Sequence, residues 1–251
     1  MSQVYLTLPS DSSYGHHPNN KPAEYITQLH HPLDLHGGEW EVGLSEIIYP
    51  RNWLTLRNLA ESTIQVLDMT DNSYRLLYVP MRHYENMESL VKEVDEKLTD
   101  VANLTWNENT KQVEFTFAAE RHRVLWSTRL QKLLGFHRML WADGEHGFMK
   151  WDGRTVWDTM DSMYVYCNIA EHQLVGDSYA PLLRIVPLDG KHGDIVSRSF
   201  ENVHYVSAKA SHFQSVEVNL RDAQGNLVPF QGGRVVIVLH LRKATMPHLS
   251  A

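Results

Sequence analysis

The feature that most constrains this chain is an alternation of apolar and polar residues that recurs along its length. From Gln112 to Phe117, and again from Gln214 to Arg221, every second residue is apolar. Successive side chains of a β-strand point to opposite faces, so a period of two predicts strands with one buried face. The same pattern occurs in four further segments, and in each of them the apolar residues share one face of their own strand. These groups are Trp40, Val42 and Leu44; Ile64 and Val66; Tyr74, Leu76 and Tyr78; and Met163, Val165, Cys167 and Ile169.

Two further segments, Leu182–Val186 and Val235–Leu241, are apolar on both faces. They are predicted to be central strands, or strands whose outer face meets another subunit. Turns rich in Asn, Asp and Gly separate the strands, because these residues tolerate positive φ and form local side-chain turns. Such turns occupy 68–73, 107–111 and 222–226.

Two segments break the strand pattern and predict short helices. Asn86 can cap a helix whose stripe of Met87, Leu90, Val91, Val94 and Leu98 has helical spacing. Ser127 can cap a second helix that stops at Gly135. We therefore predict an all-β fold: a single jelly-roll β-sandwich of two antiparallel sheets, with two short helices inserted between strands. One domain is expected over residues 1–251, with a long irregular loop at about 136–159.

Composition narrows the class of protein. The net charge of −7 argues against a dedicated nucleic-acid-binding protein, which usually carries a basic excess. Cys167 is the single cysteine, so no disulfide can form within one chain, and its apolar neighbours predict a core residue. No apolar run reaches the length of a membrane span and the first residues do not form a signal peptide, so we expect a protein kept in a reducing cytoplasm or nucleus.

No catalytic centre is legible in the sequence. There are fifteen histidines, but neither His-x-His nor His-Glu-x-x-His, the spacings that would put two imidazoles on one face of a strand or a helix. Nucleophile-elbow and P-loop strings are also missing. We therefore assign no catalytic, cofactor-binding or metal-binding residue, and expect that the protein is not an enzyme and needs no cofactor.

Candidate contact residues lie in two places. Trp141, Trp151 and Trp157 fall in the irregular loop, where they could anchor an interface or tuck back onto the domain. Arg234 and Arg242 flank the last strand. They could contact packaged nucleic acid, or protect an edge strand from unwanted pairing.

Both ends of the chain resemble a known family. The resemblance is carried by the strings at 4–10, 18–20, 25–29, 35–47, 49–50 and 213–222, by Gly225 and the pair at 229–230, and by Gly233-Arg-Val-Val-Ile-Val-Leu-His-Leu-Arg242. The middle matches more loosely, at 133–136. These strings resemble the single-jelly-roll minor capsid, or penton, proteins of Polinton (Maverick) elements and adintoviruses.

The resemblance implies a structural virion protein that forms homopentamers at the fivefold vertices of an icosahedral capsid. It also implies contact with a double-jelly-roll major capsid protein. For such a virion protein we expect a weak contact with packaged DNA through the basic residues that flank the last strand, production in host cytoplasm, and assembly in cytoplasm or nucleus. Two alternatives stay open. One is a carbohydrate- or receptor-binding β-sandwich that uses Trp141 or Trp151, and the other is a cupin-like metal-dependent enzyme.

Overall fold

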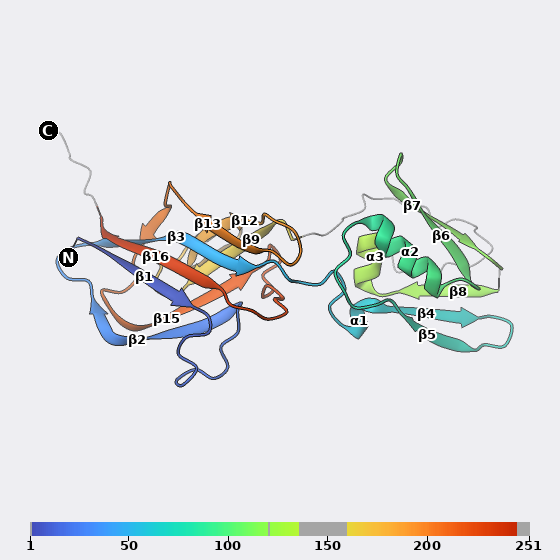
Figure 1. Ribbon diagram of the computed structural model, residues 1–251, viewed down its shortest axis with the longest axis horizontal. Coiled ribbons are helices and arrows are strands. Elements are labelled where there is room, and N and C mark those ends of the chain that lie inside the picture. Colours follow the sequence, from blue (N-terminus) through green and yellow to red (C-terminus); the bar gives the residue numbers. More distant parts are fainter. Residues whose placement is uncertain (1, 120, 136–159, 245–251) are drawn as a thin grey trace. The chain divides into compact units, whose positions relative to one another are not determined.

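The computed structural model describes residues 2–119, 121–135 and 160–244 (Figure 1). The chain divides into two compact units. Unit 1 consists of Met1–Trp53 and Met160–Ala251, and unit 2 consists of Leu54–Thr159. Each unit has its own cluster of buried apolar residues, so each is described by itself.

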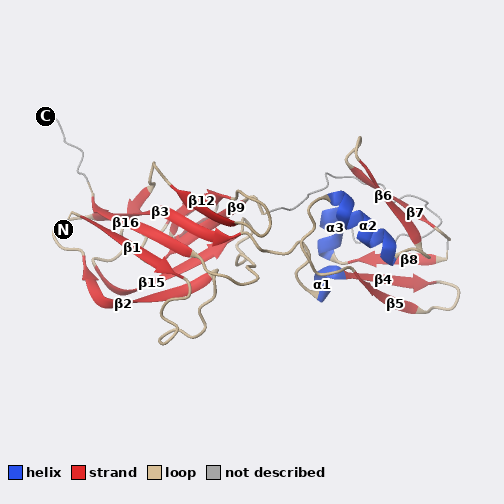
Figure 2. Ribbon diagram, in the orientation of Figure 1, coloured by secondary structure: helices blue, strands red, loops and turns tan. Residues whose placement is uncertain are grey.

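Unit 1 is a sandwich of two antiparallel sheets. One sheet has the order β1-β16-β3-β13, with the short β14 also pairing with β3, and the other has the order β12-β9-β15-β2 (Figures 1 and 2). The β10–β11 hairpin forms a small sheet of its own. The strands are β1 (Gln3–Pro9), β2 (Glu24–Asp34), β3 (Trp40–Pro50), β9 (Ser162–Cys167), β10 (Gln173–Val175), β11 (Ser178–Ala180), β12 (Leu182–Pro187), β13 (Ile195–Ser199), β14 (Tyr205–Ser207), β15 (His212–Arg221) and β16 (Val236–Lys243). Eight long strands that share two sheets in this order form a jelly roll, as the sequence predicted.

The alternation in β3 changes phase at one residue. Val42 and Leu44 point into the core, and so do Ile47 and Tyr49, although the spacing between the two pairs is odd. The register against β16 shifts at Ser45, where the strand bulges. A bulge adds one residue to one strand, so the apolar face stays buried on both sides of it.

The two sheets are joined at both sides of the sandwich. On one side the buried Tyr25 of β2 donates its hydroxyl to the carbonyl of Leu8 in β1, 3.0 Å away. On the other side the guanidinium of Arg184 in β12 lies 3.9 Å from the ring centroid of Phe200, which follows β13. These contacts link the edge strands of one sheet to those of the other.

Unit 2 combines helices with two small sheets. Its elements are α1 (Leu59–Ser62), β4 (Thr63–Asp68), β5 (Tyr74–Tyr78), α2 (Met87–Lys97), β6 (Ala102–Asn107), β7 (Gln112–Phe117), β8 (His122–Trp126) and α3 (Thr128–Leu134). One sheet has the order β5-β4-β8, and β6 pairs with β7. Figure 2 shows α2 and α3 on one side of the β4 and β8 strands, where the core of this unit lies.

Both predicted helices are confirmed. The Asn86 side chain caps α2, and the predicted stripe of apolar residues is buried. The Ser127 hydroxyl accepts from the amide of Leu130, and Gly135 ends α3 in the left-handed conformation at φ 87°. The four-residue α1, capped by Asn58, was not predicted because it is too short to show a period.

Three expectations differ from the structure. The sequence analysis expected one domain over residues 1–251, whereas 54–159 form a unit with a separate core, because periodicity indicates which face of a strand is buried but not which sheet the strand joins. Tyr74, Leu76 and Tyr78 were expected to face a core but are exposed. Leu182–Val186 was expected to be a central strand or a strand whose outer face meets another subunit; β12 lies at the edge of its sheet, so the first alternative is wrong and the second stays a prediction.

Candidate interaction surfaces

The structure separates the two arginines that the sequence grouped together. Arg242 lies near the end of β16, directly opposite Glu41 of β3. Its Nε donates to Glu41 Oε2 at 3.0 Å, and its guanidinium lies 3.6 Å from the ring centroid of Tyr205. An ion pair and a cation–π contact within the chain already occupy this side chain, so Arg242 stabilises the outer face of the sheet.

Beside Arg242 lies a row of rings that the sequence analysis missed. Tyr5, His240, Gly43 and Tyr205 occupy facing positions on β1, β16, β3 and β14. Tyr5 stacks on His240 with 4.3 Å between ring centroids, and the Tyr205 hydroxyl hydrogen-bonds His240 Nδ1 at 2.6 Å. Burial, together with the charge of Arg242, lowers the pKa of His240 below its usual value of 6.5. The neutral imidazole is therefore favoured within this row.

Gly43 makes the row possible because it carries no side chain. A Cβ at this position would lie 2.4 Å from Val203 Cγ1 and 2.6 Å from the carbonyl oxygen of His204. The backbone that leads into β14 thus rests directly on β3. The glycine is required for this close approach, and it does not adopt a positive φ.

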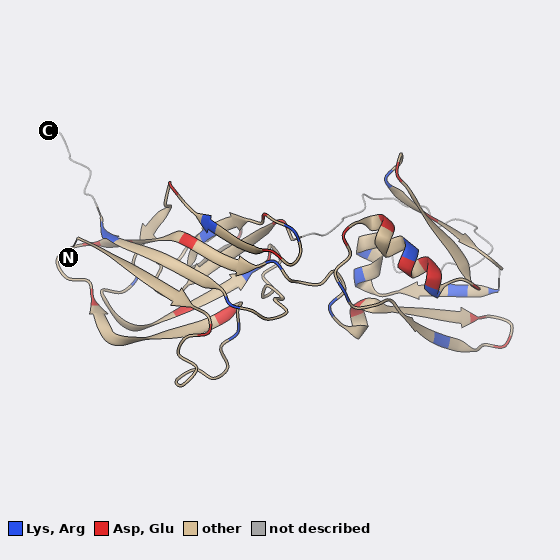
Figure 3. Cartoon of the chain, viewed as in Figure 1, with Lys and Arg blue, Asp and Glu red and all other residues tan. Residues whose placement is uncertain are grey.

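Arg234 has a different environment. It precedes β16, its side chain is exposed, and its Nη1 lies 3.9 Å from Asp11 Oδ2. It lies eight residues before Arg242, which corresponds to roughly 26 Å along an extended strand. Figure 3 shows basic and acidic residues interspersed along the described strands and helices. The two arginines therefore do not form a single basic patch.

Exposed apolar side chains occur on both sides of the sandwich in unit 1. Tyr5 and Tyr14 lie on and just after the edge strand β1, whereas Ile185 and Ile195 lie on the opposite edge strands, β12 and β13. Ile195 is the most exposed of them, at 78%. Burying such residues against another molecule would be favourable, so both sides of unit 1 are candidate contact surfaces.

The β10–β11 hairpin carries a further apolar pair. Leu174 and Tyr179 lie opposite each other, and they are 68% and 70% exposed. The turn uses Gly176 at φ 63°. A Gly-Asp pair between two short strands is a recognisable hairpin signal, but strands of three residues are too short to show a period.

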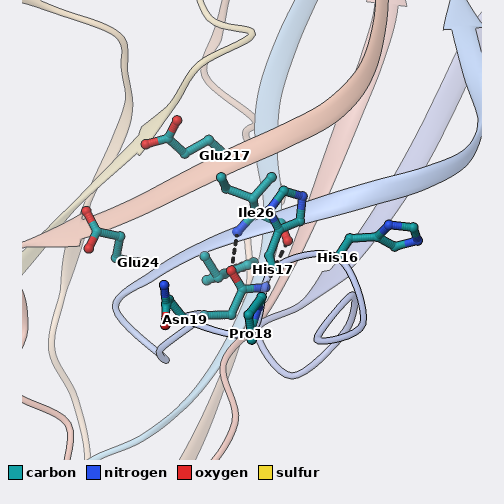
Figure 4. A pocket seen from close by; sticks show the side chains of 9 residues that line it. His16, His17, Pro18, Asn19, Glu24, Ile26 and Glu217 are labelled. Atoms are coloured by element: carbon teal, nitrogen blue, oxygen red, sulfur yellow. Dashed lines mark hydrogen bonds between the residues drawn. The ribbon is translucent and has the colours of Figure 1, made fainter.

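A shallow hollow of about 390 Å³ lies between the loop after β1 and the outer face of β2 and β15 (Figure 4). His16 and His17 line it on the loop side, and Glu24 and Glu217 line it on the sheet side. Asn20 holds the loop in place through two hydrogen bonds to the backbone of Ile26, at 2.9 and 3.0 Å.

The described part of the chain holds no group of three or more His, Cys, Asp or Glu residues arranged to bind a metal ion. None of its helices is long and apolar enough to cross a membrane. Burial raises the pKa of Cys167 to about 12, so its thiol stays protonated inside the sandwich. Trp141, Trp151 and Trp157 lie outside the described residues.

Comparison with known proteins gives a likeness in fold. No protein-family model matches the chain, and no curated protein matches it. Among solved structures, the chain is similar to the mavirus penton protein, with a TM-score of 0.51 and 10% sequence identity over 97% of this chain and 100% of that chain. It is also similar to a chain in the cryo-EM structure of the Sputnik virophage, with a TM-score of 0.48 and 10% identity over 97% and 98% of the two chains, a likeness too weak to argue from.

Proposed function

We propose that this protein is a structural virion protein, a minor capsid protein of the penton type. The observation that carries the proposal is the jelly-roll fold of unit 1, within a chain that resembles the mavirus penton protein over the full length of that protein. The double-sheet jelly roll is a fold that recurs in viral capsid proteins. Its place of action is the virion, and its work is assembly and not catalysis.

We propose further that the chain forms a homopentamer. A closed ring with fivefold symmetry uses heterologous contacts, so each subunit needs two different faces that complement each other. We assign these two faces to the side of unit 1 with Tyr5 and Tyr14 and to the side with Ile185 and Ile195, because both sides expose large apolar side chains. The double-jelly-roll major capsid protein would then surround the ring.

The remaining parts of the proposal concern the virion. Arg234 is exposed and is the better candidate for a weak contact with packaged DNA, because Arg242 is engaged with Glu41 and Tyr205. Synthesis in the host cytoplasm and assembly in cytoplasm or nucleus are parts of the same proposal.

The ring can be tested with variants that each block one side. Tyr5→Asp disables one face, and a double variant, Ile185→Asp with Ile195→Asp, disables the other. In dilute solution, light scattering coupled to size exclusion should give five times the chain mass of 29.0 kDa for the wild type and the monomer mass for each variant. The control Met69→Asp changes an exposed apolar residue of unit 2 and should keep the ring.

Mixing the two blocked variants makes the test sharper. Each variant retains one intact face, and those two faces complement each other, so the mixture should form a one-to-one dimer that cannot grow. A monomeric wild type at high concentration would overturn the proposed ring. A mixture that stays monomeric would overturn the assignment of these two faces.

The alternative functions rest on little of the described chain. A carbohydrate- or receptor-binding role was motivated by Trp141 and Trp151, which lie outside the described residues, and it stays a prediction. A glycan array with wild type and Trp151→Ala would test it. The cupin-like alternative would need a metal-binding cluster, and elemental analysis of the purified protein would test that requirement.

A further inference from the structure

The strand β5 lies at the edge of the unit 2 sheet and pairs on one side with β4. Its hydrogen-bonding direction follows from the two ends of the ladder. The amide of Asp68 donates to the Ser73 carbonyl, and the amide of Val79 donates to the Ser62 carbonyl, each at 2.9 Å. In an antiparallel pair, only every second residue bonds its neighbour.

The bonded positions on β5 are therefore Arg75 and Leu77, which lie between Ser73 and Val79. The backbone N–H and C=O groups of Tyr74, Leu76 and Tyr78 point the other way, toward the outer edge. Among the described strands, none pairs with this edge. The edge thus presents three residues whose hydrogen-bonding groups are available to another strand.

The side chains of the same three residues are also exposed. Tyr74, Leu76 and Tyr78 are 65%, 38% and 45% exposed, on the sheet face opposite the one that buries Ile64 and Val66. On the same face, half-buried Leu67 and Leu125 of β4 and β8 lie among the polar residues Thr63, Gln65 and Arg123. An edge strand with exposed apolar side chains is a template for pairing.

Two other edge strands of this chain carry devices that oppose pairing. The edge strand β2 has Pro32 and a break in its register, and β12 has a bulge between Leu182 and Arg184. The strand β5 has neither proline nor a bulge. Its single charge, Arg75, forms an ion pair with Asp100 at 2.8 Å. By this measure β5 is less protected against pairing than β2 and β12.

The strand that fits best is β5 of a second copy, because its sequence, Tyr-Arg-Leu-Leu-Tyr, is nearly self-complementary. In an antiparallel pair centred on Leu76, Tyr74 faces Tyr78 of the second copy and Leu76 faces its own equivalent. Arg75 then faces Leu77 of the second copy, so the two arginines do not oppose each other directly. Tyr74, Leu76 and Tyr78, whose backbone hydrogen-bonding groups point outward, therefore pair only with the same three residues of the second copy.

We propose that two copies of this chain associate through antiparallel pairing of their β5 strands, which joins two three-stranded sheets into one of six strands. The contact is isologous, with a twofold axis at Leu76. It is independent of the ring proposed for unit 1, which uses heterologous contacts. A single strand pair is a small interface, so we expect association that depends on protein concentration.

A cysteine at the twofold axis tests the register. Directly bonded residues of an antiparallel pair have Cα atoms about 5.5 Å apart, which lies within the range that a disulfide can bridge. The chain's single natural cysteine is buried Cys167. Under mild oxidation, full-length Leu76→Cys should form covalent dimers at least tenfold faster than Leu59→Cys, a matched exposed position of unit 2.

The mass of the assembly gives a second readout. The variant Leu76→Lys adds a charge to the edge and should remove the mass that β5 pairing adds to the wild type at high concentration, whereas Leu59→Lys should not. Circular dichroism checks that both variants are folded. Equal cross-linking of Leu76→Cys and Leu59→Cys overturns the pairing, and so does a wild-type mass that Leu76→Lys leaves unchanged. The mass of Leu76→Lys itself tests the ring, because this variant should keep the mass of five chains if the ring forms and the mass of one chain if it does not. Failure of one proposal is therefore distinguishable from failure of the other.

Discussion

The close approach at Gly43 yields a quantitative prediction about stability. In Gly43→Ala the added Cβ would lie 2.4 Å from Val203 Cγ1 and 2.6 Å from the His204 carbonyl oxygen. One of these contacts is with backbone, so rotation of a side chain cannot relieve it. The backbone segment that enters β14 must therefore move away from β3.

The expected magnitude follows from two opposing terms. Overpacking a well-filled site costs about 1–3 kcal/mol. Replacing glycine by alanine reduces the entropy of the unfolded chain, which returns about 0.4–1 kcal/mol. We therefore expect the free energy of unfolding of unit 1 to fall by about 1–2 kcal/mol. For a domain of roughly 150–250 residues this lowers the melting temperature by roughly 2–8 °C.

Differential scanning calorimetry of the full chain measures this shift. Gly15→Ala is a matched control, because no atom lies within 4 Å of its Cβ position and its φ is not positive. The control should melt at the wild-type temperature or slightly above it. If Gly43→Ala melts at or above the wild type, the close contact between β3 and the segment before β14 is not as tight as described.

Three further predictions concern the cores and the buried titratable groups. Leu44→Ala should lower the free energy of unfolding of unit 1 by about 2–5 kcal/mol, and Leu90→Ala should do the same for unit 2. Each variant should shift only the unfolding transition of its own unit, because the two cores share no residue. A variant that shifts both transitions would contradict this. Burial and Arg242 lower the pKa of His240 in the folded protein, so the unfolded state binds a proton more tightly and the free energy of unfolding should fall as the pH drops through 6.5. Chemical denaturation measured at a series of pH values should show a weaker pH dependence of this free energy in His240→Gln than in the wild type. An equal pH dependence in the two proteins would refute the assignment. The Cys167 thiol, with its pKa raised to about 12, should react with a thiol reagent at pH 8 only after denaturation, and rapid labelling of the native protein would contradict its burial.

The sequence predicted the local structure well wherever a face is buried. The strand containing Val216, Val218 and Leu220 has these three residues fully buried, as its alternation indicated. The α2 stripe and both predicted caps are also confirmed. These features could be predicted because burial on one side imposes a period on the residues themselves.

The tertiary arrangement could not be read in the same way. Tyr74, Leu76 and Tyr78 alternate as regularly as a core face, yet they lie on the exposed side of β5. A period of two indicates that the two faces of a strand differ in polarity, but it does not indicate which face packs against the core. The division into two units was missed for a related reason, because a strand pattern does not identify the strand's partners.

The candidate contact residues were predicted least well. Arg242 was predicted from the sequence as a candidate contact residue, although Glu41 and Tyr205 engage it from strands far away in the chain. His240 and Tyr205 were overlooked because their contact depends on a glycine on the strand between them. Contacts across a sheet depend on register, which an isolated strand does not reveal.

The order of the strands in unit 1 has a consequence for how the chain is made. The strand β3 pairs with β16, whose first residue, Val236, is synthesised long after Pro50. At translation rates of about 5–20 residues per second, β3 waits on the order of 10–40 s for this partner. Unit 2 is continuous in sequence and can fold during this interval, while β1, β2 and β3 remain without most of their neighbours. Nascent chains are then most vulnerable to aggregation, and we expect unit 1 to be completed only when the last strand leaves the ribosome.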